Sequence, residues 1–213
     1  MKWTFAFLSV LFVGLCFAET PKGSTIKKPS DDVFFIYKDR GSRLNHYIPS
    51  GWMGDYGDLK MNTGYHDTPG PARVQTKTVN DNTCIQIKYS ALRAQGGGWA
   101  GIYWQQPANN WGDRKGGMDL SHYKSLTFWM RGDKGGEYID KAMVGGISGI
   151  SEDGDSDSAS VEPIELTKEW KEYTIDLKGI DISYIVGGFC FVLNADMNPE
   201  GATFYVDEIK YEK

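Results

Sequence analysis

The chain is divided into short apolar runs that are bounded by turn-forming residues, and no amphipathic helix pattern separates one run from the next. Runs of this length are typical of β-strands. The sequence contains 26 glycines, and 14% of its residues are aromatic, a composition suited to many strands joined by tight turns. These features predict an all-β domain, an antiparallel β-sandwich in which two sheets pack face to face.

The predicted strands follow from the positions of these runs. They are Val33–Lys38, Ala72–Lys77, Thr83–Tyr89, Trp99–Gln106, Ser125–Arg131, Met143–Ser148, Lys171–Leu177, Val186–Asn194 and Thr203–Tyr211. Asn80-Asp81-Asn82 is a turn sequence because its residues tolerate the left-handed conformation, so the strands on either side of it are predicted to form a hairpin.

The first residues have the pattern of a secretory signal peptide. Met1-Lys2 precedes an apolar run that ends in Cys16-Phe17-Ala18, and the run is too short for a membrane anchor. We therefore expect a secreted or periplasmic protein from which residues 1–18 have been removed. Lipid attachment at Cys16 is the alternative, but Leu15 stands where such sites have a small residue. Residues 19–32 are predicted to be a flexible leader, and residues 33–213 a single β-sandwich domain.

Charge and cysteine content exclude some functions and leave others open. The chain has 28 acidic and 23 basic residues without a basic cluster, which argues against nucleic acid or an anionic membrane as a partner. No second apolar run is long enough to insert into a membrane. We expect a monomer.

Cys84 and Cys190 could pair or remain free, because the sequence does not determine the distance between them.

The run Ser125–Arg131 alternates with a period of two, which assigns its two faces. Its core positions are Leu126, Phe128 and Met130. Trp129 and Arg131 then fall on the outer face of the same strand, beside Thr127.

The run Trp99–Gln106 can be divided in the same way. Its predicted core positions are Ala100, Ile102 and Trp104. Trp99, Tyr103 and Gln105 are assigned to the outer face, because an unpaired glutamine is costly to bury.

Aromatic rings interleaved with amides suggest a sugar ligand. A pyranose has an apolar C–H face and a rim of hydroxyl groups, so it is bound by aromatic rings with polar groups around them. Most tryptophans in a sandwich fill its core, but we do not expect this of the whole set. The predicted carbohydrate-binding residues are Trp99, Tyr103, Gln105, Trp111, Trp129 and Arg131.

Three segments resemble non-catalytic carbohydrate-binding modules with the galactose-binding-like jelly-roll fold. They are Phe204-Tyr205-Val206-Asp207-Glu208-Ile209, Leu126-Thr127-Phe128-Trp129, and Lys168-Glu169-Trp170-Lys171 leading into Tyr173–Leu177. Families four, eleven and twenty-two are the most similar. The resemblance implies a jelly roll, a polysaccharide site on the concave sheet or at its edge, and often a structural calcium ion. The segment Ser50–Asp58 has no counterpart that we can assign.

A calcium site is expected at the last predicted strand. If Ile209 points inward, a period of two makes Asp207 point inward as well, and an unpaired buried carboxylate is costly. Calcium prefers oxygen ligands of this kind. The resemblance implies a second ligand near the first strand, where Asp39 is the candidate. Backbone N–H groups or a lysine are the alternative partners of Asp207.

An enzyme is the rival class, and a surface or matrix protein-interaction domain is a third. The three histidines are far apart, and no His-Glu-x-x-His, Gly-x-Ser-x-Gly or paired-carboxylate pattern is present. We therefore expect a non-catalytic module, with a jelly-roll glycosidase or lyase as the alternative.

Overall fold

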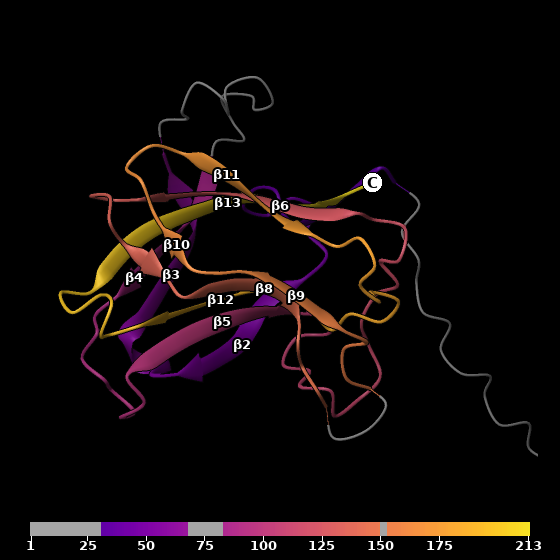
Figure 1. The fold of residues 1–213 in the computed structure, drawn as a ribbon, viewed down its shortest axis with the longest axis horizontal. Coiled ribbons are helices and arrows are strands. Elements are labelled where there is room, and N and C mark those ends of the chain that lie inside the picture. Colours follow the sequence, from indigo (N-terminus) through magenta and orange to yellow (C-terminus); the bar gives the residue numbers. More distant parts are fainter. Residues whose placement is uncertain (1–30, 68–82, 150–152) are drawn as a thin grey trace, which may run out of the picture.

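The computed structural model describes residues 31–67, 83–149 and 153–213, which form an all-β sandwich (Figure 1). Residues 1–18, most of the 19–32 leader, and the predicted strand Ala72–Lys77 with its turn lie outside the described residues. The strands are β1 Val33–Tyr37, β2 Ile48–Gly54, β3 Leu59–His66, β4 Thr83–Tyr89, β5 Trp99–Gln105, β6 Ser125–Gly132, β7 Tyr138–Ile139, β8 Lys141–Gly145, β9 Ser158–Val161, β10 Ile164–Glu165, β11 Lys171–Asp176, β12 Gly187–Asn194 and β13 Ala202–Glu212. A single 3-10 turn, η1 Tyr56–Asp58, connects β2 to β3.

Two antiparallel sheets form the layers of the sandwich. Sheet A has the order β11-β6-β13-β4-β3, and β1 also pairs with β13. Sheet B has the order β2-β5-β12-β8-β9, and β7 pairs with β10 in a short separate ribbon. In Figure 1 sheet A lies above sheet B. The predicted fold class is therefore confirmed.

The core lies between the two sheets, and the period-two analysis located it correctly. Leu126, Phe128 and Met130 of β6 are completely buried in the main apolar cluster. Ala100, Ile102 and Trp104 of β5 face them from sheet B, within the same cluster. The opposite faces of both strands therefore point away from the core.

A bulge in β13 reverses the direction predicted for Asp207. Tyr205 pairs with Arg131 and Asp207 pairs with Trp129, so both point to the outer face of sheet A. The register then shifts, and Glu208 has a positive φ of 46°. Ile209 consequently returns to the core. The prediction that Asp207 and Ile209 share a face is wrong, because the extra residue of the bulge breaks the alternation.

The two cysteines do not form a disulfide with each other, and they lie on different sheets. Cys84 belongs to β4 of sheet A, where it alternates with the core residues Ile85 and Ile87. Cys190 alternates with Phe189 and Phe191 in β12 of sheet B. Each cysteine therefore faces away from the core on its own sheet, with the sandwich between them.

Candidate functional site

The outer face of sheet B carries a second apolar cluster. Tyr103, Ile147, Val186 and Cys190 are buried in it, and Met53, Met143, Tyr184 and Val192 pack around them. Neighbouring strands align these side chains, since Tyr103 pairs with Gly51 on one side and with Cys190 on the other. This face therefore has an apolar floor instead of an ordinary polar surface.

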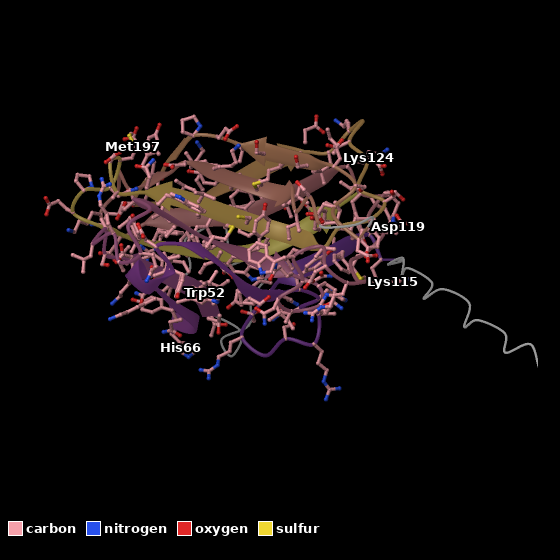
Figure 2. The ribbon with its side chains drawn as sticks, turned by 90° about the horizontal axis from the view of Figure 1, so that it is seen from below. Trp52, His66, Lys115, Asp119, Lys124 and Met197 are labelled. Carbon is pink, nitrogen blue, oxygen red and sulfur yellow. The ribbon has the colours of Figure 1, made fainter. Side chains whose placement is uncertain are left out.

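Four aromatic side chains lie along the β2 and β5 edge of sheet B, and we call them the aromatic site. They are Trp52, Tyr56, Trp99 and Trp111, of which Tyr56, Trp99 and Trp111 are 53%, 40% and 39% exposed. One of them, Trp52, pairs with Ile102 and packs against the main core cluster from the edge strand. An open depression of about 450 Å³ is lined by Trp52, Tyr56 and Trp111 together with Ser50 and Asn109. Figure 2 shows Trp52 at the margin of the sandwich.

The two exposed indoles lie near opposite ends of β5. Trp99 is the first residue of the strand, and Trp111 packs edge-on against Tyr103, with ring centroids 6.0 Å apart and planes at 85°. Tyr103 lies four positions further along the strand than Trp99, which corresponds to about 13 Å. The site is therefore wider than one sugar ring.

Hydrogen bonds to Gln105 and Ser50 fix the loop that carries Trp111. The Gln105 amide Nε2 donates to the Asn110 carbonyl at 2.8 Å, and the Ser50 hydroxyl donates to Gln105 Oε1 at 2.9 Å. The backbone N–H of Asn109 donates to Ser50 Oγ at 2.9 Å. Gln105 is thus fully buried and paired at both ends of its amide. It lies on the predicted face but supports the Trp111 loop.

Tyr103 also has a supporting position. Its hydroxyl donates to the Gly145 carbonyl at 2.9 Å, and burial raises the pKa of this phenol well above its usual range. The ring forms the edge-to-face contact with Trp111. Tyr103 therefore ties β5 to β8 and presents the neighbouring indole.

Trp129 and Arg131 do not join this site. Both belong to β6 and point to the outer face of sheet A, on the far side of the sandwich. The Arg131 guanidinium lies 3.8 Å from the ring centroid of Tyr205 and forms a two-pronged ion pair with Asp67 at 3.1 Å. Trp170 donates from Nε1 to Asp67 at 2.9 Å. The six predicted carbohydrate-binding residues therefore do not lie on one face, because β6 and β5 belong to different sheets.

Four residues of the depression were absent from the predicted set: Ser50, Trp52, Tyr56 and Asn109. Three of them lie in the segment Ser50–Asp58, to which the sequence analysis could not assign a role. The available signal was the presence of Trp52 and Tyr56 among glycines and aspartates. The Tyr56 ring is exposed, whereas Trp52 also packs against the main core from the edge strand.

The two predicted calcium ligands lie near one phenol. Asp39 accepts from the N–H and the hydroxyl of Thr83, both at 3.4 Å, and Asp207 accepts from the N–H of Glu208 at 2.9 Å. The pKa of Tyr37 is raised, chiefly by burial and further by the charges of Asp207 and Asp39. Among the described residues no three acidic, histidine or cysteine side chains gather as a metal-ligand group. Carboxylate oxygens such as these two are ligands that calcium takes in proteins.

Exposed indoles beside a hydroxyl and an amide suit the apolar face and the hydroxyl rim of a sugar. Together with the antiparallel sandwich, they define the class of non-catalytic carbohydrate-binding modules. The chain belongs to carbohydrate-binding family 30, since the family model described as "Carbohydrate binding domain 30" matches residues 44–213. Family thirty was not among the three families named from the sequence.

Solved structures share the fold. A family 30 carbohydrate-binding module has a TM-score of 0.52 and 18% identity, over 85% of this chain and 98% of that chain. The family 30 module of the cellulosomal cellulase Cel9D-Cel44B of Clostridium thermocellum gives 0.50 and 17%, over 85% and 97%. A family 11 module from the same organism, in complex with a β-1,3-1,4-mixed-linked tetrasaccharide, gives 0.52 and 13%, over 86% and 97%. All are jelly-roll sandwiches. A comparison with curated protein sequences gave no match.

No helix among the described residues is long and apolar enough to cross a membrane.

Proposed function

We propose that this module binds a single β-linked glucan chain through the aromatic site along the β2 and β5 edge of sheet B. The observation that carries the proposal is the pair of exposed indoles, Trp99 and Trp111, near the two ends of β5. Two related modules support the choice of ligand: one belongs to a cellulase, and the other was solved with a mixed-linkage tetrasaccharide.

The geometry favours an oligosaccharide over a free monosaccharide. Trp99 and Trp111 are separated by most of β5, so both rings can be covered together only by several linked sugars. Each ring would stack on the C–H face of one sugar. Ser50 and Asn109 line the depression beside Trp111 and would hydrogen bond to hydroxyl groups.

A polysaccharide panel tests the function. The purified domain should be retarded in native gels that contain mixed-linkage β-glucan or soluble cellulose derivatives, and it should release no reducing ends from them. Retardation only by unrelated polymers such as mannan would contradict the ligand assignment. Absence of retardation by every polysaccharide would favour the protein-interaction alternative.

We propose further that the protein is exported and acts outside the cytoplasm. The support is the pattern of Met1-Lys2, the apolar run and Cys16-Phe17-Ala18. The intact mass of the exported protein should correspond to a chain that begins at Glu19. A lipid adduct on Cys16 would contradict cleavage at this position.

We also propose a structural calcium ion held by Asp39 and Asp207. A ligand that binds only the folded state stabilises it, by about 2.7 kcal/mol when its free concentration is a hundredfold above the dissociation constant. For a domain of this size, removing the ion with a chelator should lower the melting temperature by roughly 5–10 °C. Asp207→Asn should remove this sensitivity, and its glucan binding at low temperature should persist. A melting curve that is the same with and without chelator, on protein shown to be metal-free, would contradict the proposal.

A further inference from the structure

Two buried carboxylates follow β2, in the segment whose role the sequence left open. Asp55 is completely buried and accepts three backbone N–H groups, those of Gln95 at 2.8 Å, Gly97 at 2.9 Å and Gly98 at 2.5 Å. Asp58, also buried, accepts the Ser90 hydroxyl at 2.8 Å and further N–H groups of the same loop. We call these two aspartates the loop clamp.

The loop that they hold has an unfavourable backbone conformation. Between Ser90 and Gly98, two residues other than glycine have positive φ angles: Ala91 and Arg93, both at 56°. Left-handed conformations of such residues persist only where the surroundings enforce them. The clamp carboxylates provide this enforcement, because the groups that donate hydrogen bonds to them are distributed along the whole loop.

The loop ends at Trp99, and Asp55 contacts the chain on both sides of it. The Asp55 side chain accepts the N–H of Gly98, and the backbone N–H of Asp55 donates to the Trp99 carbonyl at 2.7 Å. Gly54 lies against the indole, since a methyl group there would be 2.9 Å from the ring. The exposed ring of Trp99 therefore projects from a backbone that Asp55 fixes.

The charge state of Asp55 agrees with this role. The backbone N–H of Gly97 lowers the pKa of the carboxyl, burial opposes the shift, and the N–H groups of Gln95 and Gly98 lower the pKa further. The side chain is thus an anion at neutral pH, the form that accepts all three hydrogen bonds.

We propose that Asp55 is a positioning residue of the glucan site, one that holds Trp99 in the orientation in which it stacks on sugar. The inference rests on the proposed function. If the loop were free, binding would have to order both it and the indole, and this cost would appear as weaker affinity. Asp58 contributes by fixing the first half of the same loop.

A double-mutant cycle between Asp55→Asn and Trp99→Ala tests the proposal, with glucan affinity measured by calorimetry below the melting range of every variant. Asp55→Asn should weaken binding about 2- to 12-fold in the natural background. In the Trp99→Ala background the same change should have no further effect, because the ring that it positions is gone. If Asp55→Asn does not fold, Asp58→Asn replaces it in the cycle.

Asp155 provides the matched control. It likewise accepts three backbone N–H groups, from Ile147, Val186 and Gly187, but the loop that it holds does not carry Trp99. Asp155→Asn should lower the melting temperature, and its effect on affinity should be the same with and without Trp99.

Two results separate the clamp from the proposed function. If Asp55→Asn weakens binding equally in both backgrounds, Asp55 acts through the fold and the clamp proposal is overturned. If Trp99→Ala alone leaves binding unchanged, the proposed role of Trp99 in the site fails. In that case the positioning role of Asp55 is tested by NMR, through the resonance of the Trp99 indole N–H. This resonance is identified as the one that disappears in Trp99→Ala. A shift or broadening in Asp55→Asn supports positioning, and an unchanged resonance overturns it.

Discussion

Replacing both Trp99 and Trp111 with alanine should reduce glucan affinity by about two to four orders of magnitude. Truncating one central contact residue typically costs about 1–3 kcal/mol, and these two indoles are far enough apart for their effects to add approximately. Both are partly exposed, so the fold should tolerate the change. Calorimetry with a mixed-linkage β-glucan oligosaccharide measures the loss, and the melting temperature checks the fold.

Trp129→Ala is the control for this experiment. Trp129 lies in β6 on the outer face of sheet A, so its removal should leave glucan affinity unchanged even if the domain becomes less stable. Weak binding by Trp129→Ala, together with normal binding by the double variant, would move the glucan site to the opposite sheet.

Asp67→Ala should lower the melting temperature by about 6–12 °C. The Asp67 carboxylate forms the ion pair with Arg131, and both side chains are largely buried, at 13% and 14% exposure. Removing one partner leaves a guanidinium without its counter-charge among aromatic rings, which costs about 3 kcal/mol. Each kcal/mol corresponds to about 2–4 °C in a domain of this size. Thermal denaturation followed by circular dichroism measures the shift.

The companion variant Asp67→Leu with Arg131→Met removes both charges. Replacing a buried ion pair with apolar side chains of similar size is often close to neutral, so this protein should regain most of the lost stability. If Asp67→Ala melts at the natural temperature, water rather than Asp67 compensates the Arg131 charge.

The sequence was sufficient where alternation was regular. In β6 the core positions Leu126, Phe128 and Met130 are spaced by two, so the sequence predicts its faces. The run in β5 is apolar on both faces, and its core positions were assigned because an unpaired Gln105 would be costly to bury. The two-sheet architecture followed from the number and length of such runs. Trp99 was assigned to the outer face of its strand, and Trp111 was selected because it follows two amides, Asn109 and Asn110. Both indoles are partly exposed in the structure.

Two errors have physical causes that no local pattern reveals. The pairing of β6 with β13, and of β5 with β12, is decided by contacts between segments far apart in the chain, so nothing near Trp129 indicates that its sheet differs from that of Trp99. The bulge after Asp207 adds one residue to the alternation of β13, and the sequence Asp207-Glu208-Ile209 contains no glycine or proline to signal it.

The position of β13 has a consequence for the order in which the domain can assemble. This strand, the last in the chain, pairs with β6 along one edge and with both β4 and β1 along the other. Until Ala202–Glu212 has been synthesised, those three earlier strands have no common neighbour, and sheet A is divided into unconnected pieces. Sheet A therefore cannot be completed before Ala202–Glu212 has left the ribosome, whereas every strand of sheet B precedes this segment.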